Sequence, residues 1–116
     1  MTAVRPAELL KGHLDALILA ALEGGPLHGY LVMETLREST GGQLDLPTGT
    51  IYPALHRLES AGLIAGSWSL VSGRRRRCYV LTDAGRKALS VRRADWQQFA
   101  SVIGGMLGGN PWPTTA

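Results

Sequence analysis

The sequence has one cysteine, seven aromatic residues among 116, and no long apolar run. The lone Cys78 cannot form a disulfide within the chain, so no disulfide framework holds this fold. The longest apolar stretch, Ala16 to Leu22, is far shorter than the roughly 20 residues that a membrane-spanning helix needs. Met1 to Glu8 lack the apolar region of a secretory signal. We therefore expect a cytoplasmic protein with no membrane partner.

The sequence also lacks the patterns of metal centres and of enzymes. The histidines, His13, His28 and His56, have no ligand spacing with one another or with Cys78, so we predict no zinc or iron site. There is no glycine-rich phosphate loop, and no nucleophile, base and orienting residue can be assembled from the motifs. We predict that the protein is not an enzyme and uses no cofactor.

The net charge of only +3 conceals an uneven distribution. From Arg57 to Arg93 there are nine basic and two acidic residues, a net charge of +7, and the remainder of the chain therefore carries −4. Arg74 to Arg77 form an unbroken run with no acidic residue nearby in the sequence. Such a cluster repels itself unless an anion is present, which favours a surface that faces nucleic acid. An exposed, solubilising run is the alternative.

Apolar periodicity predicts three short helices before any strand. The predicted helices cover about residues 12–23, 27–39 and 50–61, and two strands at 63–69 and 77–81 form a hairpin through Ser72 and Gly73. Thr82 and Asp83 then begin a last helix of some 20 residues. We expect Tyr30 on the buried side of the second helix and Trp68 packed between the sheet and a helix.

This order of elements is that of a winged helix-turn-helix, with three helices and a two-stranded wing. The predicted fold class is α+β, mostly α. We expect a DNA-binding domain over residues 9–82, a C-terminal dimerisation helix over 83–104 and a flexible tail over 105–116. The last helix carries a narrow apolar stripe with heptad-like spacing, which suits a partner helix. The stripe residues expected at the interface of a homodimer are Leu89, Trp96, Phe99 and Ile103.

The third helix has a candidate recognition face opposite its apolar residues Ile51, Leu55 and Leu58. Small residues there let the backbone approach base edges, and side-chain donors can reach phosphates or guanine N7. The first turn also supplies N–H groups that can hold a phosphate. A face that is simply solvated is the alternative. The candidate DNA contacts are Thr48, Thr50, Tyr52, Pro53, His56 and Arg57 on this helix and Arg74, Arg75 and Arg76 in the wing.

Four separated motifs resemble the PadR family of bacterial transcriptional regulators. They are Leu27-His28-Gly29-Tyr30, the segment from Gly49 to Glu59, Gly62-Leu63-Ile64, and the segment from Gly73 to Gly85. The resemblance covers about residues 9–90 and keeps the family's order. It implies a winged-helix DNA-binding domain, a homodimer held by C-terminal helices, and repression that a small molecule relieves. The sequence departs from the family at Cys78 and Val80, which flank Tyr79. Family members commonly have an aromatic and a basic residue at these two positions.

Trp96 is a candidate ligand contact as well as an interface residue. Some members of the short-tailed branch, which this chain resembles, stack flat aromatic ligands on an aromatic residue at a similar place between subunits. The alternative is that Trp96 is only the hydrophobic centre of the interface.

The full prediction is a sequence-specific regulator of double-stranded DNA. We expect a homodimeric repressor, released by a small hydrophobic or aromatic ligand, whose operator has two half-sites about 34 Å apart. A winged-helix module that binds protein or RNA, with no operator, is the alternative from another class.

Overall fold

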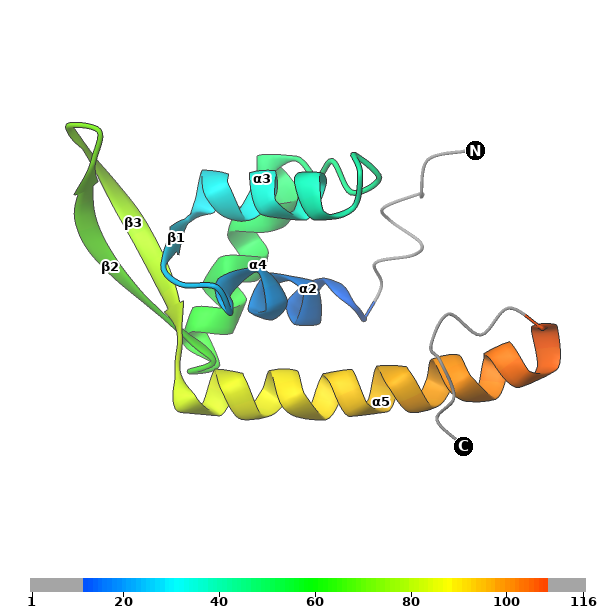
Figure 1. The fold of residues 1–116 in the computed structure, drawn as a ribbon. Helices are drawn as coiled ribbons and strands as arrows, with labels where there is room; N and C mark the ends of the chain where they lie inside the picture. The colour runs from blue at the N-terminus through cyan, green and yellow to red at the C-terminus, as the bar shows by residue number, and fades with distance from the viewer. Residues whose placement is uncertain (1–11, 109–116) are drawn as a thin grey trace.

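The computed structural model describes residues 12–108, which form four helices and one small sheet (Figure 1). The elements are α2 (Leu14–Leu22), β1 (Leu27–His28), α3 (Gly29–Ser39), α4 (Thr48–Ser60), β2 (Ile64–Val71), β3 (Arg74–Leu81) and α5 (Asp83–Leu107). The sheet is antiparallel, with β3 between β1 and β2. Helix, helix, helix and hairpin follow in the predicted order, so the α+β winged-helix fold class is confirmed.

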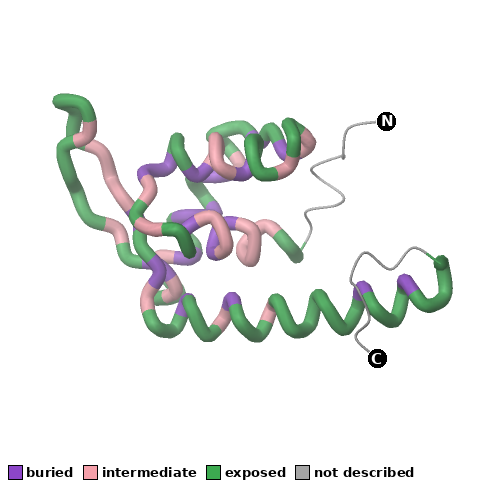
Figure 2. The backbone as a smooth tube through the Cα atoms, viewed as in Figure 1, coloured by how far each residue is buried: buried purple, intermediate pink, exposed green. Residues whose placement is uncertain are grey.

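The core lies where α2, α3 and α4 meet and where the sheet closes one side. On α4 the buried residues are Ile51, Ala54, Leu55 and Leu58, which is the apolar face that the sequence period predicts. The tube in Figure 2 is buried where these elements face one another and exposed along most of the hairpin and of α5. Within residues 12–108 no helix has the length and apolar character needed to cross a membrane.

The helix predicted from residue 27 begins at Gly29 instead, because Leu27 and His28 form a short strand. Leu27 lies opposite Tyr79 and His28 opposite Cys78 on β3. His28 then caps α3, since its Nδ1 accepts a hydrogen bond from the Leu31 N–H at 3.4 Å. Burial of the ring, with a smaller contribution from the charge of Arg76, lowers the pKa of His28 and so favours its neutral form. A two-residue strand has no period that sequence analysis can detect.

The buried face of α3 also differs from the prediction. Gly29, Val32 and Leu36 point into the core, whereas Tyr30 is 52% exposed. The ring of Tyr30 stacks on His28, with centroids 6.5 Å apart. The expectation of a buried tyrosine was wrong because the start of the helix, and hence its rotation, follows from the β1–β3 pairing.

Two helix ends also differ from the prediction. α4 starts at Thr48 with Pro47 as its N-cap, so Pro53 lies inside the helix rather than in its first turn. Proline in a helix interior removes a hydrogen bond, and here the fully buried opposite face holds the helix together. α5 continues through residues 105–107, which the sequence placed in a flexible tail, and ends at Gly108 with φ of 75°. The rest of that tail and residues 9–11 lie outside the described residues.

Two arginines hold the first half of α5 against α2. Arg93 donates to both carboxylate oxygens of Glu23 at 2.7 Å, and Arg92 donates to the Gly12 carbonyl. The 25-residue helix is about 37 Å long, and its second half extends beyond α2 (Figure 1).

The start of α5 is packed tightly against the turn before β2. Thr82 accepts from the Gly85 N–H at 3.0 Å, and its own hydroxyl donates to the Gly62 carbonyl at 2.6 Å. A Cβ on Gly85 would lie 1.9 Å from the Leu63 carbonyl oxygen, which is backbone and cannot rotate away. Only glycine fits at this point, and the close approach sets the direction in which α5 leaves the domain.

We predict that Gly85→Ala lowers the free energy of unfolding by about 1–3 kcal/mol, because the new methyl group forces the helix away from the turn. Gly105→Ala in the same helix is the matched control, since a Cβ there meets nothing within 4 Å. Gly105→Ala should raise the free energy of unfolding by about 0.5–1 kcal/mol, because alanine has a higher helix propensity than glycine. Urea denaturation of both variants measures this difference, and equal effects would contradict the close packing at Gly85.

Candidate nucleic-acid interface

The outer face of α4 presents the residues that the sequence singles out. Thr48, Tyr52, Pro53, His56 and Arg57 are all exposed. Thr50 is half-buried beside them. The first intrahelical donor is the Thr50 N–H, which reaches the Pro47 carbonyl at 3.0 Å, so the two N–H groups before it point out of the helix end. This face combines small residues, hydroxyl donors and a free helix N-terminus.

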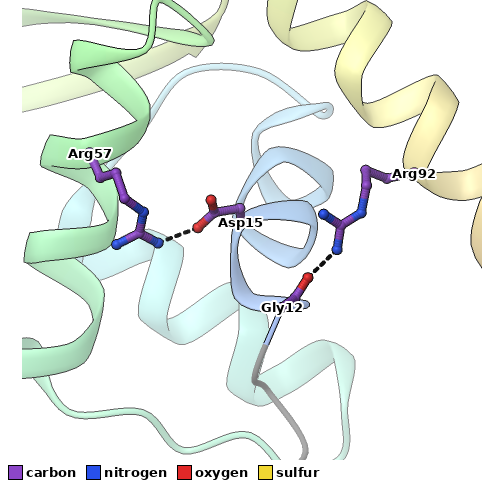
Figure 3. A network of polar contacts seen from close by, with 4 residues as sticks. All are labelled: Gly12, Asp15, Arg57 and Arg92. Atoms are coloured by element: carbon purple, nitrogen blue, oxygen red, sulfur yellow. Dashed lines mark hydrogen bonds and ion pairs between the residues drawn. The ribbon is translucent and has the colours of Figure 1, made fainter.

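Arg57 is engaged within the molecule. Its guanidinium donates to the carboxylate of Asp15 on α2, which links the two helices across the domain (Figure 3). Both side chains remain accessible to solvent, at 57% for Arg57 and 40% for Asp15. An exposed pair of this kind contributes little to stability, so a phosphate can replace Asp15 at small cost.

The wing separates its four arginines onto two faces of the hairpin. Arg75 lies opposite Leu70 and Arg77 opposite Trp68, so these side chains share one face. Arg74 and Arg76 point to the other face. Arg74 and Arg75, nearest the tip, are exposed, whereas Arg76 and Arg77 are half-buried.

The arginine run has an acidic neighbour that the sequence order hides. Glu59, at the end of α4, accepts from Arg77 Nη2 at 2.5 Å and from the Gly66 N–H at 3.1 Å. The Arg77 guanidinium holds the pKa of Glu59 below its usual range, and the carboxylate raises the pKa of Arg77. The expectation of four unpaired arginines was therefore wrong for Arg77. In residues 12–108 the other three wing arginines form no ion pair.

Trp68 does not pack between the sheet and a helix as expected. It is 58% exposed on the wing. The guanidinium carbons of Arg75 and Arg77 lie 5.2 and 5.8 Å from its ring centroid, within the range of cation–π attraction. The wing thus carries an exposed aromatic ring near two arginines of β3, with Arg77 directly opposite it and Arg75 two residues nearer the tip.

A groove of about 750 Å³ lies between α2, the loop after α3, and α5. Trp96 stands in its wall, with ring centroids 5.8 Å from His13 and 5.9 Å from Phe99. Three of the described lining residues are basic, namely His13, Arg92 and Arg93, and none is acidic. Thr40 and Gln43 are polar, and apolar side chains line the rest.

The apolar stripe of α5 is buried near the start of the helix and exposed farther along it. Leu89 packs into the core of its own domain and is 3% exposed. Trp96, Phe99 and Ile103 are 40–56% exposed, and Met106 continues the row at 84%. In the part of the chain that the structure describes, no three His, Cys, Asp or Glu side chains converge as a metal site would require.

A basic wing beside an exposed helix, with a long helix following, is an arrangement shared with known proteins. The profile of the family described as "Transcriptional regulator PadR-like family" matches residues 18–91. This chain belongs to the PadR family. The resemblance drawn from four sequence motifs is therefore confirmed, and so is the prediction that the protein is a transcriptional regulator rather than an enzyme.

Individual PadR relatives agree with this assignment. The "Transcriptional regulator Rv3488" of Mycobacterium tuberculosis is 48% identical over 58 residues, and the match spans 49% of this chain and 54% of that protein. A PadR family transcription regulator from Clostridium difficile R20291 is 35% identical, with a TM-score of 0.75 over 83% of this chain and 99% of that one. The PadR-like regulator BC4206 from Bacillus cereus is 29% identical, with a TM-score of 0.77 over 86% and 96%.

Sequence reasoning did not identify the roles of three residues that shape this PadR surface. Asp15 holds Arg57 from 42 residues away, and Glu59 holds Arg77 from 18 residues away. Trp68 was noticed but assigned to packing. One signal was available, because Trp68 and Arg77 occupy opposed positions in the predicted hairpin and could have been expected to share a face.

Proposed function

We propose that this PadR regulator is a homodimeric repressor that binds an operator in double-stranded DNA in the cytoplasm. In this proposal α4 enters the major groove and the wing lies on the adjacent backbone. The observation that carries it is the pairing of an exposed donor face on α4 with three wing arginines, Arg74 to Arg76, that have no acidic partner among the described residues. Residues 9–82 would bind DNA, and α5 would join two copies.

The proposed contacts divide into those that position the protein and those that read the sequence. Arg74, Arg75 and Arg76 would neutralise phosphates, and the N–H groups at the start of α4 would hold another. His56 lies in the middle of the exposed α4 face, where a side chain can reach a base edge. Thr48, Thr50, Tyr52, Pro53 and Arg57 would complete the contact surface.

We predict that the protein prefers a duplex from its own upstream region over a random duplex, as measured by fluorescence anisotropy at several salt concentrations. Arg74→Ala and Arg75→Ala should weaken binding to both duplexes and each reduce the salt slope by about 0.9, because each removes one phosphate contact. His56→Ala should weaken operator binding alone, by about 5- to 150-fold, if it reads a base.

Arg37→Ala provides the control, since Arg37 is an exposed arginine on α3 that pairs with Glu34. It should leave both affinities unchanged. Equal wild-type affinity for operator and random duplex at physiological salt would contradict the proposal. Binding to RNA or to an acidic protein in preference to duplex DNA would instead favour the interaction-module alternative.

The proposed dimer forms through the outer half of α5. Trp96, Phe99, Ile103 and Met106 recur at spacings of three, four and three residues, so they form one apolar row along the helix. An exposed row of this kind, next to a largely apolar groove, marks an interaction surface. Leu89 would support the row from beneath, where it packs into the core.

We predict that Phe99→Glu converts the dimer to a monomer in sedimentation experiments while the helical circular dichroism signal is retained. Operator affinity should fall by at least 100-fold, because a monomer contacts only one half-site. Ser101→Glu is the matched control, since it places the same charge on the opposite side of the exposed helix. Dissociation by both variants, or by neither, would contradict an interface along the row.

We further propose that a small hydrophobic or aromatic ligand binds in the groove at Trp96 and releases the repressor from DNA. Arg92 in the lining forms no ion pair among the described residues, and its positive charge favours a neutral or anionic aromatic compound over a cationic one.

We predict that such compounds quench a fluorescence component that Trp96→Phe removes, and that they lower operator affinity in the wild type but not in the variant. Matched cationic compounds should have weaker effects. Absence of any Trp96-dependent response across neutral, anionic and cationic compounds would leave Trp96 with a packing role alone.

A further inference from the structure

The end of α4 is joined to the wing by a half-buried ion pair. Glu59 accepts hydrogen bonds from Arg77 at 2.5 Å and from the Gly66 N–H at 3.1 Å, so one carboxylate holds both strands of the hairpin. The two side chains are 25% and 34% exposed, less than those of the Arg57–Asp15 and Arg93–Glu23 pairs. This contact is better shielded from solvent and salt than those two pairs.

The strand leaves space for this contact by having a glycine where the two side chains cross. A Cβ on Gly66 would lie 2.8 Å from Arg77 Nε and 2.8 Å from Glu59 Oε2. Any larger residue would push the guanidinium or the carboxylate aside. Glycine thus lets the two side chains keep this geometry, which a Cβ would change.

The contact continues along the same face of the hairpin toward its tip. The guanidinium carbons of Arg77 and Arg75 lie over the Trp68 ring, 5.8 and 5.2 Å from its centroid. A row therefore runs from Glu59 through Arg77 and Trp68 to Arg75. We call these four residues the wing clamp.

The hairpin needs such a restraint because most of it extends away from the core. β1 covers β3 only at Tyr79 and Cys78, and beyond that point the two strands pair with each other alone (Figure 1). A two-stranded hairpin by itself is marginally stable in water. Without a contact to α4, the arginines of the hairpin would sample many orientations. The conformational entropy lost when DNA orders them would then reduce the affinity.

We propose that Glu59 is a positioning residue for DNA recognition, which acts through Arg77 and Trp68 to fix the angle between α4 and the wing and to hold Arg75 ready for a phosphate. The inference rests on the proposed DNA-binding function. Glu59 itself does not touch DNA in this account. Its role is to let α4 and the wing engage one duplex without reorganisation.

Electrostatics alone predicts that removing this carboxylate strengthens DNA binding, whereas a positioning role predicts that it weakens operator binding. Glu59→Gln removes a negative charge beside a proposed polyanion site and releases Arg77 for a phosphate. Simple charge counting then gives tighter binding and a salt slope steeper by about 0.9. A positioning role gives weaker operator binding instead. The direction of the change therefore separates the two.

The experiment compares full-length wild type and Glu59→Gln on operator and random duplexes by anisotropy between 50 and 200 mM salt, as for other duplex-binding proteins. We expect operator affinity to fall by about 5- to 20-fold, from the ordering of wing side chains, while random-duplex affinity stays equal or rises. Glutamine still fits the site and can accept from Gly66, so the thermal unfolding midpoint should change little. Operator affinity that is unchanged or tighter in Glu59→Gln would overturn the inference.

Gly66→Ala tests the same clamp without changing any charge. Its methyl group should displace Arg77 and lower the ratio of operator to random affinity by a similar factor, so it replaces Glu59→Gln if that variant fails to fold. Glu38→Gln, which removes an exposed carboxylate on α3, is the charge control and should leave the ratio unchanged. A wild type with no operator preference would overturn the proposed function and this inference together. If the wild type prefers its operator, and Gly66→Ala and Glu59→Gln have the same ratio of operator to random affinity as the wild type, only the role of the wing clamp is overturned.

Discussion

Ile51, Leu55 and Leu58 on α4 are almost completely withdrawn from water, and their burial sets the rotation of this helix about its own axis. Most of the opposite side of α4, including Pro53 and His56, is exposed as a consequence. The helix tolerates Pro53 in its interior because the proline lies on that exposed side, while the apolar face supplies the stabilisation. The proposed recognition surface is thus the face of α4 that points away from the core.

The basic residues of this regulator divide into two groups by what lies next to them. Arg57, Arg77, Arg92 and Arg93 each bond to a carboxylate or carbonyl on another element, and so tie α4, the wing and α5 to their neighbours. Arg74, Arg75 and Arg76 form no ion pair within residues 12–108. The net charge of +7 from Arg57 to Arg93 therefore overstates the charge offered to an anion, and the wing carries most of the charge that remains unpaired.

α5 has two halves with different environments. The first half is attached to α2 by Arg92 and Arg93 and begins at the close contact between Gly85 and Leu63. The second half carries an exposed apolar row. Because the helix is continuous, whatever binds to the outer half is mechanically connected to the DNA-binding domain. In the proposed dimer this connection would set the separation of the two α4 helices.

The fold class, the family, the buried face of α4 and the apolar row of α5 could be predicted from the sequence, because helical periodicity and motif order are local properties of the chain. The short β1 strand, the exposed Tyr30 and the partners of Arg57 and Arg77 could not. Each of these depends on a segment 18 to about 50 residues away, since pairing with β3 sets where α3 begins and the ends of α4 and β3 must meet before Glu59 can reach Arg77. The sequence by itself determined the order of the helices and which side of α4 is apolar. Only the tertiary structure decided which arginines are neutralised internally and which remain available to an anion, because charge pairing requires proximity in space.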